Sequence, residues 1–390
     1  MSFRPVFAAN ARAERGGQGQ FLSQMGRALA GTPATIFSRG ASGAGVDVVN
    51  IPFRGPRRGL FDILVGAPYL RGRQDWLTVL SDVQFDHSVA SRLSPELAPT
   101  HFDGVMAQCL DSLRRAKSAG ARTIVTSLNT HITHLRRVMD EEYARVGDTG
   151  HHFVHPAMER RALAEIAAAD HIRVNSHSAK STFVDAGIDP ACVTVIHPGV
   201  DLAHFRDTPK ADEVFRVMAV ATIDPRKGMH VLIRAFIDAA LPNAELEIIG
   251  GTSDRWSKQL IANTTRQQAD IRVRSLDVSR VPVAKSYGRA SVLVHPAIED
   301  GFGLVIPQAL ASGRPVIATS TSGASELIRH GENGFVVPPR SSREITEHLR
   351  ALHSDHTLHA RLSLAARPSV SHLTYDAFGL AVREMYARLG

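Results

Sequence analysis

The chain has 390 residues, of which 44% are hydrophobic and 21% charged, and its formal net charge is +7. This length suffices for two domains of ordinary size, and no apolar run approaches the roughly 20 residues needed to span a bilayer. Two cysteines, Cys109 and Cys192, are too few for a disulfide framework or a sulfur metal site. The positive charge suits anionic substrates or an anionic membrane surface, whereas arginines spread without interleaved aromatic residues argue against nucleic acid.

The N-terminus, Met1 to Phe7, has no extended apolar core followed by a small-residue cleavage site. We therefore expect no signal peptide and a cytoplasmic location.

The first half of the chain alternates strand-like and helix-like segments, as an α/β domain does. We predict strands at 5–9, 121–126 and 171–176, and helices at 21–29, 105–119 and 178–186. A connector rich in proline and glycine then begins near Ile196. We place an N-terminal domain at residues 1–199 and a linker at 200–214.

Gly16-Gly17-Gln18-Gly19 precedes the first predicted helix. No glycine follows Gly19 three residues later, so the dinucleotide-binding fingerprint is absent. A glycine loop that opens a helix lets its backbone approach a phosphate or a sugar, and a simple tight turn is the alternative.

The segment from Phe53 to Trp76 mixes five arginines with apolar and aromatic residues, and only Asp62 and Asp75 oppose them. Such a mixture suits an anionic leaflet. We predict peripheral contact with a membrane surface here, and the alternative is that the apolar residues belong to the core while the arginines face water.

Asn129-Thr-His131-Ile-Thr-His134 directly follows the predicted strand at 121–126. Ligand groups of parallel α/β sheets gather at the carboxyl ends of the strands. No matching carboxylate or cysteine cluster supports a metal site at these two histidines. The alternative to a ligand role is one surface histidine and one capping histidine.

The second half again alternates strand and helix, and we assign residues 215–372 to a second domain. Its predicted strands are at 215–221, 246–250, 290–294 and 334–337. Residues 375–389 have the helical spacing of Phe378, Ala381, Val382 and Tyr386, and we treat 373–390 as a separate C-terminal helix.

Two cations, Arg226 and Lys227, stand with Gly228 where the strand at 215–221 gives way to a helix. Adjacent cations at a strand-to-helix turn suit a diphosphate, because they form charge-assisted hydrogen bonds in a desolvated site. A solvated basic turn is the alternative.

The most informative segment runs from His295 to Thr319. A predicted strand ends there in the acidic, glycine-rich turn Glu299-Asp300-Gly301-Phe302-Gly303-Leu304, and an apolar helix follows. Backbone N–H groups at a helix N-terminus favour negative charge, and glycines allow close approach of a ligand. Asp300 and Gln308 bracket the junction, so the expected ligand has an anionic and a hydroxylated part, as a nucleotide sugar does.

The pattern Asp300-Gly-Phe-Gly-Leu, Gln308-Ala and Gly313-Arg-Pro-Val-Ile-Ala318 resembles the donor-site signature of glycosyltransferase family 4. The resemblance implies the GT-B architecture: two facing Rossmann-like α/β domains, with a C-terminal helix that crosses back to the first domain. The family usually has two glutamates separated by seven residues, where this chain has Asp300 and Gln308. Glu299 is one residue early and pairs only with Pro307, so we reject that register.

The resemblance also implies roles for individual residues. The family's first loop places a Gly-Gly such as Gly16-Gly17 at the donor, its Lys-Gly, here Lys227-Gly228, holds the donor diphosphate, and its first-domain histidine contacts the transferred sugar. His131 aligns best with that histidine, and His134 is second. Arg226 substitutes for a family arginine whose place Thr222 occupies. Glu326 supports the phosphates, or else stabilises a helix dipole.

We therefore expect a retaining, metal-independent glycosyltransferase that moves a sugar from a nucleoside-diphosphate sugar to a hydroxyl acceptor. No cofactor is expected, and Lys227, Arg226 and the helix N-terminus near Gly303 would neutralise the leaving diphosphate. His131 and Asp300 would orient the sugar. The alternatives are a nucleotide-sugar epimerase of the same architecture and a non-catalytic nucleotide-sugar-binding protein.

Overall fold

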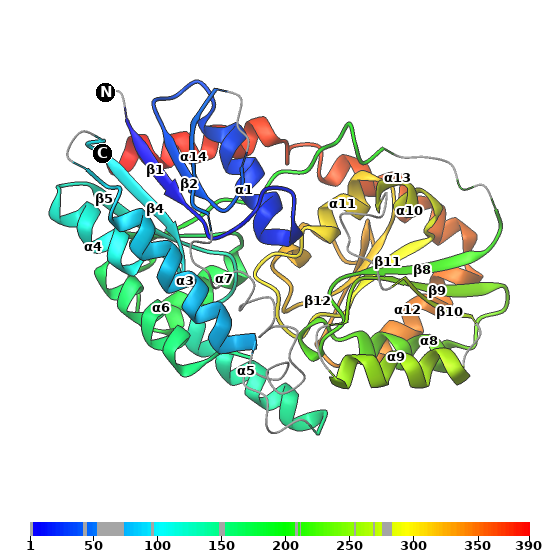
Figure 1. The fold of residues 1–390 in the computed structure, drawn as a ribbon. Coiled ribbons are helices and arrows are strands. Elements are labelled where there is room, and N and C mark those ends of the chain that lie inside the picture. Colours follow the sequence, from blue (N-terminus) through cyan, green and yellow to red (C-terminus); the bar gives the residue numbers. More distant parts are fainter. Residues whose placement is uncertain are drawn as a thin grey trace. The chain divides into compact units, whose positions relative to one another are not determined.

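The computed structural model describes residues 3–41, 45–52, 74–94, 97–147, 153–206, 210, 212–252, 255–267, 270–274 and 283–390. The chain divides into two compact units. The first comprises Met1–Asp140, Gly150–Gly199 and Tyr375–Gly390, and the second comprises Glu141–Thr149 and Val200–Thr374. Each unit is built on its own parallel sheet (Figure 1).

The sheet of the first unit has the strand order β3-β2-β1-β4-β5-β6-β7, and every neighbouring pair is parallel. The order reverses between β1 and β4, which makes this pair the topological switch point. The strands are β1 Pro5–Ala8, β2 Thr35–Ser38, β3 Asp47–Asn50, β4 His101–Val105, β5 Arg122–Ser127, β6 His171–Val174 and β7 Val193–Val195.

Helices cover both faces of this sheet because strand side chains alternate between the faces. Phe7 packs in a core with residues of α1 and α14, whereas Val6 packs in a core with residues of α3 and α4. The helices named in the first half of the chain are α1 Gly16–Leu29, α3 Gln74–Ala90, α4 Leu110–Ser118, α5 Ile132–Arg145, α6 Pro156–Ala168 and α7 His177–Asp185, with the short 3-10 helix η1 Pro190–Cys192.

The C-terminal helix α14, Tyr375–Leu389, belongs to the first unit and packs against α1. The rings of Phe21 and Phe378 meet edge to face with centroids 5.9 Å apart. The hydroxyl group of Tyr386 donates to the buried carboxylate of Asp103 at 2.8 Å. The return of the last helix to the N-terminal unit, expected from the family resemblance, is confirmed.

The sheet of the second unit has the strand order β10-β9-β8-β11-β12-β13, again parallel throughout. Here the order reverses between β8 and β11, so these two strands form the switch point. The strands are β8 Phe215–Val220, β9 Ala244–Ile249, β10 Ile271–Arg274, β11 Val292–His295, β12 Val316–Thr319 and β13 Gly334–Val337.

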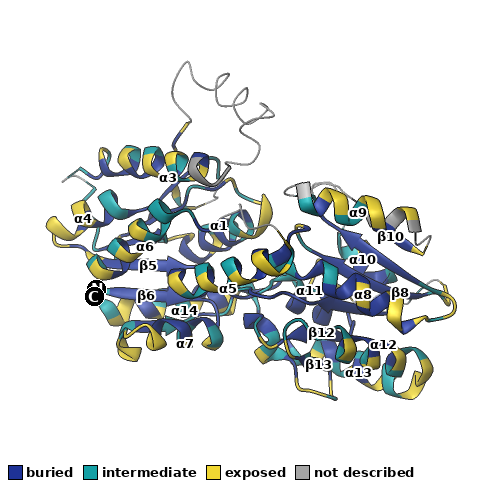
Figure 2. Cartoon of the chain, turned by 90° about the horizontal axis from the view of Figure 1, so that it is seen from below, coloured by how far each residue is buried: buried dark blue, intermediate teal, exposed yellow. Residues whose placement is uncertain are grey.

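Two cores also enclose the second sheet. Val217 of β8 belongs to the core shared with α8 and α12, and Met218 belongs to the core shared with α11 and α13. Figure 2 shows β8, β9, β11 and β12 as largely buried and the outer helix faces as largely exposed. The helices are α8 Met229–Ala239, α9 Arg255–Gln267, α10 Val283–Arg289, α11 Val305–Ala311, α12 Ser342–Ser354 and α13 His356–Ser369, with the 3-10 helices η2 Pro225–Lys227 and η4 Gly323–Leu327.

Two sequence predictions about helices are wrong. The first helix begins at Gly16 rather than Phe21, so the glycines form its first turn. Val105 ends the strand β4, and the next helix begins only at Leu110. The segment His101–Val105 contains an aspartate and a glycine, which disfavour strands, but pairing with β1 and β5 overrides that preference.

The arginine-rich segment from Phe53 to Trp76 lies outside the residues whose side chains the structure describes. Among the described helices, none is both long and apolar enough to cross a membrane.

Candidate active site

The basic turn of the second unit follows β8 and is fixed by its own backbone. Asp224 accepts a hydrogen bond from the backbone N–H of Lys227 at 2.9 Å, which closes η2. Gly228 has a φ of 64°, and a Cβ there would overlap the carbonyl oxygen of Pro296. The N–H of Ile298 donates to the carbonyl of Arg226 at 2.8 Å. This turn is therefore locked against the segment that follows β11.

Lys227 and His295 converge on the carboxylate of Asp300. The Nζ atom of Lys227 lies 2.6 Å from Oδ2 of Asp300, and the Nε2 atom of His295 lies 2.9 Å from the same oxygen. Burial favours a higher pKa for Asp300, but Lys227 and the hydrogen bond from His295 outweigh it, so its pKa lies well below the ordinary value. Asp300 is thus an anion beside a cation, close to the carboxyl ends of β8 and β11.

The neighbouring pair is Arg226 and Glu299, whose Nη1 and Oε2 atoms are 2.9 Å apart. The side chain of Glu299 is 2% exposed. Burial favours a lower pKa for Arg226, but the charges of Glu299, Asp300 and Asp224 raise it above the ordinary value. The guanidinium group expected at the diphosphate is therefore engaged by Glu299 in this structure.

The glycine-rich turn after Asp300 leads directly into α11. Gly303 has a φ of 88°, in the left-handed region. Gly301 is buried, and the side chain of Phe302 is 3% exposed and packs in the core. Leu304 stands at the N-cap position of α11 without a capping side-chain hydrogen bond. Phe302 thus holds the turn on the core, and a ligand could contact it mainly through its backbone.

Gln308 lies on α11 and is partly exposed. Its side-chain oxygen accepts a hydrogen bond of 3.3 Å from the hydroxyl of Tyr287, which is fully buried. Burial raises the pKa of Tyr287, so this hydroxyl remains a donor, and it also lies 3.4 Å from the carbonyl oxygen of Val305.

Glu326 is exposed and stands in η4, a five-residue 3-10 helix that leads to the strand β13. The sequence suggested that this segment enters a helix, but the structure has only this short 3-10 helix here. A dipole role for Glu326 is weak here because a single short turn aligns few peptide groups.

In the first unit, Gly16 and Gly17 are exposed at the start of α1, and the space where their side chains would stand is open. Gly19 is the close-packed glycine, since a Cβ there would overlap the carbonyl oxygen of Arg12. Gly16 and Gly17 therefore leave their backbone accessible after β1, and Gly19 fixes the shape of the turn.

His131 directly precedes α5 and is 4% exposed. Its Nδ1 atom accepts a hydrogen bond from the backbone N–H of Thr133 at 3.3 Å, and its ring packs edge-on against Phe183. Burial and the nearby His134 lower the pKa of His131, so the ring is neutral near pH 7. His131 thus lies directly after β5 and accepts a backbone hydrogen bond of the first turn of α5. His134 is half-buried on α5.

Two family descriptions match this chain in succession. The description "Glycosyltransferase Family 4" matches residues 15–204, and "Glycosyl transferases group 1" matches residues 201–368. The chain belongs to glycosyltransferase family 4.

Curated relatives of this family 4 member include D-inositol 3-phosphate glycosyltransferases. The one from Streptomyces bingchenggensis is 27% identical over 66% of this chain and 60% of its own length. The one from Xylanimonas cellulosilytica is 25% identical over 96% of this chain and 92% of its own length. The chain thus spans about three fifths of the former and most of the latter.

Solved structures share the fold of this family 4 member. Sucrose-phosphate synthase from Thermosynechococcus elongatus superposes with a TM-score of 0.73 at 20% identity and covers 99% of both chains. Anabaena HepE in complex with UDP and glucose gives 0.71 at 18% identity, over 99% of this chain and all of HepE. The expected α/β fold of the GT-B class is confirmed.

Sequence reasoning did not single out two residues that hold the site and one buried polar residue of the first unit. His295 and Tyr287 hold Asp300 and Gln308, and only the folded chain brings Tyr287 of α10 to α11. Asn175 follows β6 in the first unit, is 5% exposed, and its side-chain oxygen has no hydrogen-bond partner within the described part of the chain. Its place directly after a strand was a signal that the sequence did contain.

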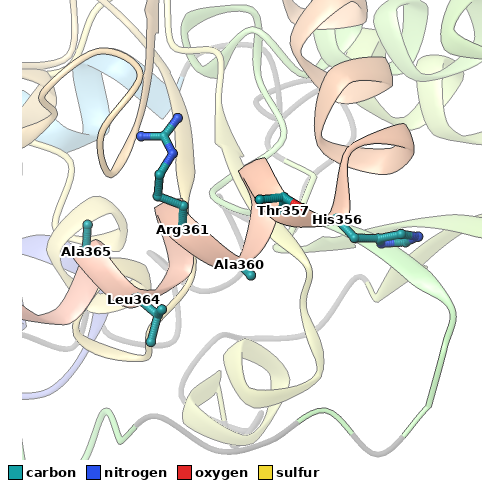
Figure 3. Close-up of a pocket in the computed structure, with 6 residues that line it drawn as sticks. All are labelled: His356, Thr357, Ala360, Arg361, Leu364 and Ala365. Atoms are coloured by element: carbon teal, nitrogen blue, oxygen red, sulfur yellow. The ribbon is translucent and has the colours of Figure 1, made fainter.

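Two other features of this family 4 chain lie outside these sites. Among the described residues, no three His, Cys, Asp or Glu side chains are grouped as a metal would require. A depression of about 750 Å³ lies along α13 and includes Arg361 and Leu364 but none of the residues discussed above. Figure 3 shows the side chains that line it.

Proposed function

We propose that this protein is a retaining, metal-independent glycosyltransferase that moves a sugar from a nucleoside-diphosphate sugar to a hydroxyl acceptor. The observation that most directly supports this function is the convergence of Lys227 and His295 on Asp300, near the carboxyl ends of β8 and β11, the strands of the switch point. Ligands of open α/β sheets bind outside the carboxyl ends of the strands at that point.

In this proposal Lys227 neutralises the diphosphate leaving group. Its Nζ atom is largely buried, with its side chain 12% exposed, so a charge-assisted hydrogen bond there is stronger than one in water. Negative charge grows on the departing phosphate oxygen as the bond to the sugar breaks. The interaction with Lys227 therefore strengthens in the transition state, which makes it catalytic as well as binding.

Retention follows if the acceptor attacks the face that the diphosphate leaves. The bond between C1 of the sugar and the phosphate oxygen breaks, a bond between C1 and the acceptor oxygen forms, and the acceptor proton passes to the departing phosphate oxygen. Asp300 accepts hydrogen bonds from sugar hydroxyls and does not form a covalent intermediate.

In the first unit, the exposed backbone of Gly16 and Gly17 and the ring of His131 are the groups for which the family resemblance implies a role toward the donor. A neutral His131 orients the sugar and does not act as a base. Gln308 contacts the ribose of the donor, and Arg226 and Glu326 support the phosphates.

The donor and acceptor are proposed from the relatives. HepE was solved with UDP-glucose, and the curated relatives are named for D-inositol 3-phosphate. We therefore propose UDP-glucose and D-inositol 3-phosphate as the first pair to test, beside GDP- and ADP-sugars and other polyols.

A thermal-shift screen of UDP-, GDP- and ADP-sugars tests donor binding, because a ligand that binds the folded state raises its apparent stability. Incubation of labelled donors then follows the sugar. Transfer to an acceptor with the anomeric configuration kept supports the proposal. An inverted product refutes retention, an epimerised nucleotide sugar without acceptor indicates an epimerase, and tight binding without any release of nucleoside diphosphate indicates a non-catalytic binding protein.

A further inference from the structure

His295 is the last residue of β11 and points its ring at the candidate site. The side chain is 2% exposed, and its Nε2 atom lies 2.9 Å from Oδ2 of Asp300. Burial lowers its pKa, and so do the charges of Lys227 and Arg226, although Asp300 opposes them. The ring is therefore neutral, and because a carboxylate can only accept, Nε2 bears the hydrogen that it donates.

Gly303 has no side chain and so leaves room for the contact between His295 and Asp300. A Cβ on Gly303 would stand 3.1 Å from Nε2 of His295 and 3.5 Å from Oδ2 of Asp300. The contact is thus closely enclosed by backbone.

The two donors leave the other carboxylate oxygen lightly engaged. Lys227 and His295 both bind Oδ2, whereas Oδ1 accepts only a long hydrogen bond of 3.4 Å from the N–H of Phe302 among the described residues. Oδ1 of Asp300 is therefore the atom that can accept a hydrogen bond from a sugar hydroxyl group.

We infer that His295 is a positioning residue that keeps Asp300 in place for the donor sugar when Lys227 turns from Asp300 to the diphosphate. The inference rests on the proposed function. In this inference the ammonium group of Lys227 moves toward the diphosphate when the nucleotide sugar arrives, and its hydrogen bond to Asp300 weakens. The neutral imidazole N–H remains on Oδ2, and the short aspartate side chain keeps its orientation.

Two variants separate this role from simple packing. His295→Gln places an amide N–H at about the reach of Nε2, and His295→Leu fills similar volume without a donor. We compare kcat and KM for the nucleotide sugar, the dissociation constant of the free nucleoside diphosphate by calorimetry, and the thermal unfolding midpoint.

For His295→Leu we expect kcat/KM to fall about 10- to 100-fold, mainly through kcat, since a hydrogen bond to a charged group is lost. Affinity for the free nucleoside diphosphate, which has no sugar to orient, should stay within about twofold. His295→Gln should stay within about threefold of wild-type kcat/KM because it restores the donor. If the leucine variant does not fold, His295→Met serves the same purpose.

Wild-type kinetics in the leucine variant would overturn the inference. So would equal impairment of both variants, or a matching loss of nucleoside diphosphate affinity, because either result indicates general disruption of the turn. A wild-type protein that transfers sugar from none of the donors would overturn the proposed function, and this inference with it.

Discussion

At the scale of single residues, the candidate site of the second unit is an arrangement of paired charges. Asp300 joins the end of β11 to the turn after β8 through Lys227, and Glu299 does the same through Arg226. The sequence pattern located these residues, but only the structure shows that each cation already has an anionic partner. In the proposed function, Lys227 is therefore shared between Asp300 and the diphosphate.

Replacing Lys227 by alanine should lower kcat/KM roughly 30- to 1000-fold, because a preorganised cation at the proposed leaving group is lost. This factor corresponds to about 2–4 kcal/mol of transition-state stabilisation. Steady-state kinetics with the donor found in the screen measure this. Lys258→Ala removes an exposed lysine of α9 and should leave kcat/KM unchanged. A fully active Lys227→Ala enzyme would show that the diphosphate binds elsewhere.

The two bracket positions should respond differently. Asp300→Ala removes a charged acceptor, so we expect kcat/KM to fall about 10- to 100-fold. Gln308→Glu should stay within about threefold of wild type, because a carboxylate also accepts the hydroxyl hydrogen bond of Tyr287. Full activity in Asp300→Ala, measured in the same assay, would revive the register based on Glu299.

At the scale of elements, buried polar groups fix helices to the sheet of the first unit. Asp103 of β4 is fully buried and accepts hydrogen bonds from Thr126 at 2.5 Å and from Tyr386, and Arg173 lies 3.3 Å away. Glu165 of α6 is also fully buried and accepts hydrogen bonds from the backbone N–H groups of Ala107 and Cys109 before α4.

Tyr386→Phe should destabilise the protein by about 1.5–3 kcal/mol, because the buried carboxylate of Asp103 loses a donor while its neighbours stay in place. Urea unfolding measures the change. Leu380→Ala, at a position of α14 that is 52% exposed, should change stability far less. Equal effects of the two substitutions would mean that α14 is held by general packing and not by this hydrogen bond.

Glu165 should make stability depend on pH. Burial raises its pKa to about 8 against the two backbone hydrogen bonds, whereas a glutamate in the unfolded chain titrates near ~4.3. Protonation thus favours the folded state, and the contribution is lost as pH rises through about 8.

We expect the free energy of unfolding to fall by on the order of 1 kcal/mol per pH unit between about pH 5 and 8 on account of this residue. Urea titrations of wild type and Glu165→Gln at several pH values measure the slope, which should be shallower in the variant. Glu384→Gln, on the exposed side of α14, should keep the wild-type slope. Parallel curves for wild type and Glu165→Gln would contradict the assignment.

At the scale of the whole molecule, two parallel sheets each place a strand-order reversal beside the residues proposed for the site. Gly16 and Gly17 follow β1 in the chain, Lys227 follows β8, and Asp300 follows β11. In the proposed mechanism, cations and hydrogen-bond donors of the protein neutralise the leaving group.

We therefore expect full activity in excess EDTA, since Lys227 supplies the charge that a divalent ion would otherwise provide. Transfer assays with chelator, and with Mg²⁺ or Mn²⁺ added back, test this. Activity that disappears with EDTA and returns with either ion would refute the metal-independent mechanism. Lys227→Ala assayed with added Mg²⁺ serves as the control for nonspecific rescue.

The sequence by itself determined the fold class, the family and the position of the glycine-rich family signature. Contiguous residues form that signature, and the βα turns that present it, such as Pro225–Gly228, follow local rules of glycine and capping residues. The last helix was predicted with the bounds that it has, Tyr375–Leu389, because its apolar face has a helical period.

Tertiary structure alone decided which side chains act together. His295 and Asp300 are five residues apart, but their contact with Lys227 depends on β8 and β11 becoming neighbours. The strand at His101–Val105 was missed because its buried aspartate is acceptable only once Arg173 and Tyr386 reach it from distant elements. Long-range partners of buried charges leave no periodic trace along a chain, so local pattern could not reveal them.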